Sequence, residues 1–176
     1  DIDVNGALNL SEILKKDVKI ITLFLYVESA QILIERLTGR GEKDIALRLE
    51  RYNHEMSKRN LYSYLINNNS LENTSRLVDE IVKFEKSGAK FVTSLCENEI
   101  SEKAVKEALD VYARGENPEP VKVSVYDGVF CITEGVERYV ASLVCGKTIA
   151  KDLTLDENAA KVSADLDICG YAKKFS

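Results

Sequence analysis

Apolar residues recur at helical spacing in the middle of the first half of the chain. One stripe lies at positions i, i+4, i+7 and i+11 and consists of Ile45, Leu49, Tyr52 and Met56. A second stripe runs through residues 71–87, follows the loop sequence NNNS, which is rich in helix-capping residues, and ends at Ser87-Gly88. Both patterns are typical of amphipathic helices with one buried face.

The N-terminal segment also favours a helix. Ser11 can cap a segment that runs on to a stop at Gly39, although the β-branched residues at 18–22 also allow a strand there. Together with the two stripes, this segment predicts a helical block over residues 1–88.

The pattern changes after Gly88. The sequence AKFVTSL at 89–95 has the composition of a short strand, and Ser101 can cap the helix that follows it. The valines of VKVSV alternate with polar residues, which predicts a strand with one buried face. Asp127-Gly128 then joins VKVSVY to VFCIT, the strongest short-range sequence signal of a β-hairpin.

A helix between two glycines, a strand and a helical tail are expected after the hairpin. The helix lies between Gly135 and Gly146, the sequence KTIAKDL follows as the last strand, and the tail is expected to be helical to about Ile168. The predicted fold class is therefore α+β. It consists of the helical block (1–88) and a small α/β module with a C-terminal helix (89–176).

The two parts are expected to pack together. The run from Ile20 to Val27 is apolar almost all round, so a helix there needs cover on more than one side. The connection at Ser87-Gly88 is short and is not a flexible linker. Either the α/β module or a second copy of the chain must cover this face, and the second choice would give a homodimer through the helical block.

Charge and composition exclude several classes of protein. The chain has 176 residues, of which 45% are hydrophobic and 30% charged, and its net charge is −5. Residues 1–88 carry 13 basic and 14 acidic side chains and residues 89–176 carry 11 and 15, so neither half shows the broad basic footprint of a nucleic-acid-binding domain.

No apolar run reaches the length of a membrane span, and the N-terminus lacks the pattern of a signal peptide. No membrane partner is expected.

The four cysteines show no C-x-x-C spacing. We interpret them as free, mostly buried thiols in a reducing compartment, which predicts a cytoplasmic protein. His54 is the only histidine, and nothing in the sequence indicates a zinc or a haem site.

A candidate phosphate site lies in ITEGVERYVASLVCGKTI, residues 132–149. A strand ends at Gly135 and a helix begins, with Arg138 in its first turn. The first N–H groups of a helix have no partner within the helix, and glycine lets the backbone approach an anion closely. Arg138 can offer two donors to phosphate oxygens, and Lys147 can add charge. The alternative is structural: Gly135 serves a turn with positive φ, and Arg138 forms a surface ion pair with Glu134.

The ordered set of elements in residues 89–155 resembles the ParB/sulfiredoxin-like superfamily. The resemblance rests on Pro120 before VKVSV, the DG hairpin, the GVERYVA sequence and the GKTIA run. It implies a nucleotide, CTP or ATP with Mg²⁺, whose phosphate is held by Gly135, Arg138 and Lys147. The resemblance does not extend to residues 1–88.

The sequence departs from the family pattern at two positions. Glu137 stands where partition proteins carry Arg, and Val136 stands where sulfiredoxin carries its catalytic Cys, so sulfiredoxin chemistry is excluded. Glu134 and Glu137 flank the predicted phosphate turn and would repel a triphosphate unless Mg²⁺ bridges them to it. In the related serine kinases a Glu that acts as catalytic base ends the first strand, and Glu97 stands at a similar place.

Three interpretations of function follow from these features. The first is a ParB-like nucleotide- or nucleic-acid-associated protein in plasmid or chromosome maintenance, with DNA as an additional partner. The second is a nucleotide-dependent small-molecule kinase or phosphohydrolase that uses Glu97 and Arg138. The third is a non-catalytic interaction protein in which the site is degenerate.

Overall fold

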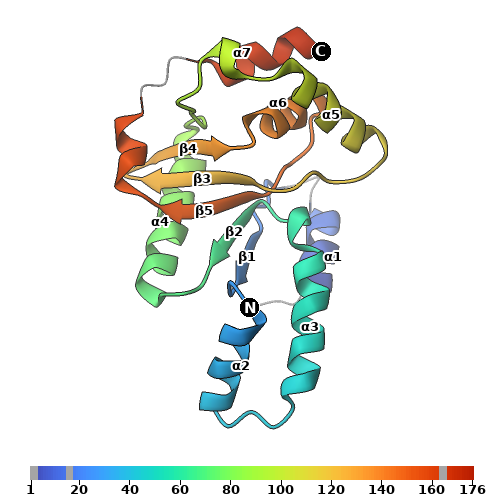
Figure 1. Cartoon of the computed structure of the whole chain (residues 1–176), viewed down its shortest axis with the longest axis vertical. Coiled ribbons are helices and arrows are strands. Elements are labelled where there is room, and N and C mark those ends of the chain that lie inside the picture. Colours follow the sequence, from blue (N-terminus) through green and yellow to red (C-terminus); the bar gives the residue numbers. More distant parts are fainter. Residues whose placement is uncertain (1–3, 15–17, 163–165) are drawn as a thin grey trace.

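One five-stranded sheet runs through the whole molecule (Figure 1). The computed structural model describes residues 4–14, 18–162 and 166–176. The strand order is β1-β2-β5-β3-β4; all neighbouring pairs are parallel except β3 and β4, which form an antiparallel hairpin. The strands are β1 (Leu23–Tyr26), β2 (Tyr64–Asn67), β3 (Val121–Tyr126), β4 (Val129–Glu134) and β5 (Lys151–Leu155).

Helices occupy the connections between these strands. The α-helices are α1 (Val4–Leu14), α2 (Ala30–Gly39), α3 (Ile45–Ser57), α4 (Leu71–Ser87), α5 (Glu102–Ala113), α6 (Val136–Cys145) and α7 (Ile168–Ala172). Short 3₁₀ turns are η1 (Arg59–Leu61), η2 (Glu97–Glu99), η3 (Glu157–Lys161) and η4 (Lys173–Phe175). In Figure 1, α2 and α3 form a hairpin that projects away from the sheet, and neither helix has a buried residue.

The main core lies between the sheet and the helices α4, α5, α6 and α7. Successive residues of a strand point to opposite faces. Ile66 and Leu153 therefore pack with residues of α4 such as Leu77 and Ile81, in the main core cluster. Leu65 lies on the other face, in a smaller cluster with residues of α1. An aromatic group links α4 to the hairpin, because the ring of Phe130 lies 4.1 Å from that of Phe84 between centroids.

Several predicted elements are confirmed. The predicted helices around residues 45–56 and 71–87 are α3 and α4, and the Ser70 hydroxyl in the NNNS loop caps α4. Ser101 caps α5 as expected, since its hydroxyl accepts a hydrogen bond from the Ala104 N–H at 3.2 Å. The Asp127-Gly128 hairpin forms with positive φ at both residues, 47° and 79°. The mixture of helices and a sheet agrees with the predicted α+β class.

The prediction of an all-helical block over residues 1–88 is wrong, because this part contributes β1 and β2 to the sheet. Strands of a parallel sheet are buried on both faces, so their sequences are continuous apolar runs that look like buried helices. The run from Ile20 to Val27 looks the same because β1, although an edge strand, is apolar on both faces: Phe24 is buried and Leu25 is 51% exposed. Ser11, the predicted cap, lies inside α1. β2 pairs along one edge of β1 within the same chain, but Leu25 of β1 is 51% exposed, and the homodimer stays a prediction.

Smaller predictions in the second half need correction as well. The segment AKFVTSL forms only one bridge, between Val92 and Cys131, rather than a strand. The tail is not one helix, because residues 157–161 form a 3₁₀ turn and α7 begins only at Ile168. All four cysteines are free, as expected, but only Cys131 is buried.

The sheet crosses the expected boundary at residue 88. β2, from the first part, pairs with β5, from the second part, through the register Tyr64↔Lys151 to Ile66↔Leu153. The two parts therefore pack together, as the sequence predicted. No helix in the described part of the chain is long and apolar enough to cross a membrane.

A lysine lies in an aromatic cage on the covered face of the sheet. The ammonium of Lys151 is 5.3 Å from the ring centre of Tyr64 and 5.5 Å from that of Phe91. Burial lowers the pKa of Lys151 to about 8, although the nearby Glu85 carboxylate acts in the opposite direction. Glu85 itself accepts hydrogen bonds from the Tyr64 hydroxyl at 2.6 Å and from the Lys19 ammonium at 2.7 Å. The charge of Lys151 therefore opposes folding.

Replacing this lysine by an apolar residue of similar length is expected to stabilise the chain. Lys151→Met should raise the free energy of unfolding at pH 7 by roughly 1–3 kcal/mol, because it removes the cost of burying the charge. In the parent, the folded chain releases the Lys151 proton near pH 8 and the unfolded chain near the usual lysine value of 10.5. Between these values the unfolded state binds more protons, so the parent gains stability as pH rises and its deficit relative to the variant shrinks.

Urea unfolding of both chains from pH 7 to about pH 10 measures this difference. Lys103→Met is the control, because the Lys103 side chain is 87% exposed and carries no such cost. A Lys151→Met chain that is less stable than the parent at pH 7 would contradict the prediction.

Candidate functional site

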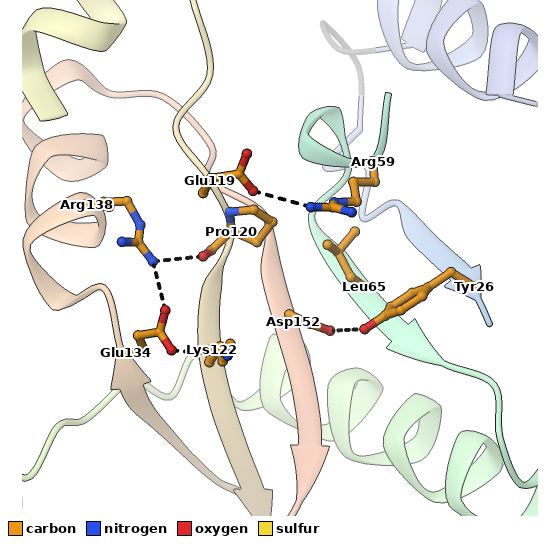
Figure 2. A pocket seen from close by; sticks show the side chains of 9 residues that line it. All are labelled: Tyr26, Arg59, Leu65, Glu119, Pro120, Lys122, Glu134, Arg138 and Asp152. Atoms are coloured by element: carbon orange, nitrogen blue, oxygen red, sulfur yellow. Dashed lines mark hydrogen bonds and ion pairs between the residues drawn. The ribbon is translucent and has the colours of Figure 1, made fainter. Parts of the chain in front are cut away.

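A cavity of about 380 Å³ lies on the sheet face opposite α4 (Figure 2). Leu65 and Asp152 point into it from neighbouring strands, β2 and β5. Both parts of the chain contribute to its wall, which consists of Tyr26, Arg59, Leu65, Glu119, Pro120, Lys122, Glu134, Arg138 and Asp152. The cavity therefore exists only because the parallel pairing of β2 with β5 brings the two parts side by side.

Three cations and three carboxylates line this cavity. Arg59 pairs with Glu119, with 3.3 Å between Nη2 and Oε2. Glu134 accepts two partners, since its Oε2 lies 3.1 Å from the Lys122 ammonium and its Oε1 lies 3.8 Å from Nη2 of Arg138. Each cation thus has a carboxylate beside it, and the wall is close to neutral.

Arg138 is held by the backbone as well as by Glu134. Its Nη2 donates a hydrogen bond to the Pro120 carbonyl at 3.0 Å, which ties the first turn of α6 to the start of β3 (Figure 2). Gly135 ends β4 with φ of 85°, and a Cβ at this position would collide with the Arg138 guanidinium. The positive φ favours glycine at this position, and a larger residue would also displace the Arg138 guanidinium. Nε of Arg138 is buried and has no hydrogen-bond partner among the described residues.

Tyr26 and Asp152 form the opposite wall. The Tyr26 hydroxyl donates a hydrogen bond of 2.9 Å to Oδ1 of Asp152. Burial raises the pKa of the Asp152 carboxyl above its usual value, and the hydrogen bond from Tyr26 partly offsets this effect. Burial also raises the pKa of Tyr26, with a further contribution from the charge of Asp152, so this hydroxyl remains a donor at neutral pH.

The structure brings together only some of the residues that the sequence singled out. One side of the cavity brings together Gly135, Arg138 and Glu134. The structural interpretation of these residues holds, because Gly135 has a positive φ and Arg138 forms an ion pair with Glu134. Lys147 lies elsewhere, because its ammonium lies over the ring of Tyr112, 5.3 Å from the centroid, and donates to the Tyr112 carbonyl at 3.4 Å.

Two predicted acidic residues also lie away from this cavity. Oε1 of Glu137 accepts a hydrogen bond of 3.4 Å from the Ser101 N–H, at the start of α5. Glu97 is paired with Lys174 and lines a separate pocket with Cys96 and Tyr171. The expectation that Glu97 and Arg138 face one pocket is therefore wrong. The strand predicted before Glu97 does not form, so this residue lies in a 3₁₀ turn instead of at a strand end.

Sequence reasoning missed six residues of the cavity wall, namely Tyr26, Arg59, Leu65, Glu119, Lys122 and Asp152. No binding motif marks them, and they come from β1, η1, β2, the loop before β3, β3 and β5. Only the strand register places them together. The alternation within KTIAKDL is the one local signal available, since it puts Asp152 and Lys151 on opposite faces.

No group of three His, Cys, Asp or Glu side chains that could hold a metal ion occurs among the described residues. Mg²⁺ in nucleotide sites is usually held by one or two carboxylates together with the phosphates of the substrate. Glu134 fits that role from the cavity wall, and Glu137 does not line the cavity.

Comparison with known proteins gives one consistent group of relatives. Part of the chain is similar to the guanylate kinase of Chlorobium chlorochromatii, with 40% identity over 74 residues, which is 40% of this chain and 38% of the relative. The guanylate kinase of Rickettsia felis is 34% identical over 92 residues, 51% of this chain and 46% of the relative. That of Corynebacterium glutamicum is 31% identical over 85 residues, 47% and 43% respectively.

The chain thus spans less than half the length of these curated relatives. No family model matches the chain. No solved structure matches it either.

These relatives correct the first interpretation of function. The prediction of a ParB-like, DNA-binding protein with a sulfiredoxin fold is wrong, because the curated relatives are guanylate kinases. The features behind it have a general physical explanation. Asp-Gly is common in any tight hairpin, and a glycine with positive φ serves any abrupt turn from strand to helix. Arg138 and Lys147 make structural contacts with backbone carbonyls.

Proposed function

We propose that this chain binds guanine nucleotides in the cavity on the open sheet face. The observation that carries the proposal is the similarity of 31–40% to guanylate kinases over 74–92 residues. Of the functions predicted from the sequence, the nucleotide-dependent kinase agrees best with these relatives. Of the two predicted nucleotides, CTP has no support, whereas ATP with Mg²⁺ agrees with relatives that are kinases; for this cavity we propose a guanine nucleotide.

The size and the chemistry of the cavity support this choice. A volume of about 380 Å³ lies within the usual range for small-molecule sites. Arg59, Lys122 and Arg138 supply the cations that phosphate oxygens require. Asp152 supplies a carboxylate acceptor on the opposite wall, and guanine carries an exocyclic amino group that donates hydrogen bonds. A guanine nucleotide has both kinds of group, at opposite ends.

Calorimetric titration of the full chain with GMP, GDP and GTP, and with the matching adenine nucleotides, tests this proposal. We expect binding of guanine nucleotides with a preference of about tenfold or more over adenine, because the guanine amino group can donate to the half-buried Asp152 carboxylate and adenine has no donor at that ring position. Asp152→Asn should reduce this preference, whereas Asp110→Asn, on the exposed side of α5, should not. Absence of binding by every nucleotide, with and without Mg²⁺, would refute the proposal.

Phosphoryl transfer is a second candidate function, because the relatives are guanylate kinases. In such reactions the protein mainly positions the nucleotide and stabilises phosphate charge, with Mg²⁺ neutralising charge on the phosphates when bound. Formation of GDP from GMP and ATP with Mg²⁺, followed by ³¹P NMR, tests it. Binding without turnover would support nucleotide binding alone and reject the kinase.

A further inference from the structure

Glu134 lies where an anionic ligand would be expected. Among the described residues that line the cavity, it is the one carboxylate with two cationic partners, the Lys122 ammonium at 3.1 Å and the Arg138 guanidinium at 3.8 Å. Two neighbouring cations that converge on one pair of oxygens are also the arrangement that binds phosphate. The Glu134 side chain is 57% exposed, so the two ion pairs hold it only weakly and it can turn out to solvent at little cost.

Arg138 is incompletely satisfied in this arrangement. Its Nη2 already donates to the Pro120 carbonyl, and the 3.8 Å contact with Glu134 is too long for a hydrogen bond. Nε is buried and has no partner among the described residues. A buried donor of a charged group without an acceptor is rare in proteins, so the present contacts leave the guanidinium short of acceptors. A guanidinium carries several N–H donors in a planar fork, so Arg138 can still donate to phosphate oxygens where it lines the cavity.

We propose that Arg138 and Lys122 hold the phosphate of the nucleotide, and that Glu134 is an intramolecular competitor that occupies the same two cations between binding events. A phosphate monoester carries nearly two negative charges at pH 7, whereas the Glu134 carboxylate carries one. Two cations therefore favour the phosphate over the carboxylate. The choice of a nucleotide rests on the proposed function, while the phosphate site can be tested with inorganic phosphate alone.

This arrangement predicts effects of opposite sign for neighbouring residues. Glu134→Gln removes the competitor and should tighten binding of inorganic phosphate and of GMP about two- to fivefold. Lys122→Gln and Arg138→Gln remove charge-assisted contacts with phosphate, and the second should weaken binding about tenfold or more. If Glu134 only positioned Arg138 for the ligand, its replacement would weaken binding instead.

The control is an ion pair of similar geometry outside the cavity. Nη2 of Arg114 lies 3.7 Å from Oε2 of Glu116, and both side chains are more than half exposed. Glu116→Gln changes the net charge of the chain by the same amount as Glu134→Gln. It should leave the affinity for phosphate unchanged, so it separates a local effect from a general electrostatic one.

The experiment is titration of the parent chain and of each variant with inorganic phosphate and, separately, with GMP and AMP. Circular dichroism melts check that the variants are folded, and Glu134→Gln decides the outcome if Arg138→Gln does not fold. Tighter phosphate binding by Glu134→Gln but not by Glu116→Gln supports the inference. Equal or weaker binding overturns it, even if GMP still binds better than AMP. Phosphate binding with the expected signs but without a guanine preference would reject only the guanine nucleotide.

Discussion

A fragment of residues 89–176 alone is expected to lose cooperative unfolding altogether. In the full chain β5 lies between β2 and β3, and the fragment leaves one side of this central strand without its hydrogen-bond partner. It also removes α4, whose Ile81 and Phe84 cover the buried face of the β3–β4 hairpin, including Phe130. An exposed apolar sheet face with an open edge favours aggregation over folding.

Urea unfolding followed by circular dichroism, together with sedimentation, measures this effect. The control is a chain in which α2 and α3 are replaced by a short Gly/Ser linker. Neither helix has a buried residue, so this chain should keep a cooperative transition. A soluble, monomeric 89–176 fragment that melts as cooperatively as the full chain would show that the two parts are independent.

Phe130→Ala is expected to cause a large loss of stability from a single substitution. Phe130 is fully buried, and its ring contacts Phe84, Phe91 and Tyr64, with centroid separations of 4.1, 5.8 and 6.4 Å. Truncation leaves a cavity between α4 and the hairpin and should lower the free energy of unfolding by about 3–5 kcal/mol. This is a large part of the total stability of a typical domain, which is about 5–15 kcal/mol.

The urea midpoint at constant m-value gives the size of this loss. Leu71→Ala serves as the control, because Leu71 is a large apolar residue that is 84% exposed. It should change the free energy of unfolding by less than about 0.5 kcal/mol. A loss below about 1 kcal/mol for Phe130→Ala would mean that the site collapses around the smaller side chain, contrary to the close packing of the aromatic rings.

Elements with strong local signals were predictable from the sequence. The β3–β4 hairpin follows from Asp127-Gly128, and α6 follows from the two glycines that flank it. β1 and β2 were not predictable in the same way. Each is only four residues long. β2 is buried on both faces and β1 carries an exposed Leu25 opposite its buried Phe24, so neither shows the alternation of apolar and polar residues that identifies a strand. Their parallel partners lie far away in the sequence, so no turn between adjacent strands marks them.

In the candidate site, too, some residues are placed by local sequence and others by strand pairing between distant segments. Gly135 and Arg138 are placed by the local turn from β4 to α6, and this turn has the geometry that the sequence indicated. Asp152 and Tyr26 meet only because β1, β2 and β5 pair in a particular register. That register depends on packing across the whole sheet, and no short segment of sequence contains it.

The position of β5 in the sheet has a consequence for how the protein is made on the ribosome. β5, at residues 151–155, lies between β2 and β3 in the sheet, yet it is the last of the described strands to be synthesised. Until it emerges from the exit tunnel, β1–β2 and the β3–β4 hairpin are two separate pairs that lack the strand between them. Until β5 emerges, the nascent chain therefore carries exposed strand edges and uncovered apolar faces. Such a chain folds late and depends on chaperones during synthesis more than one built from local contacts.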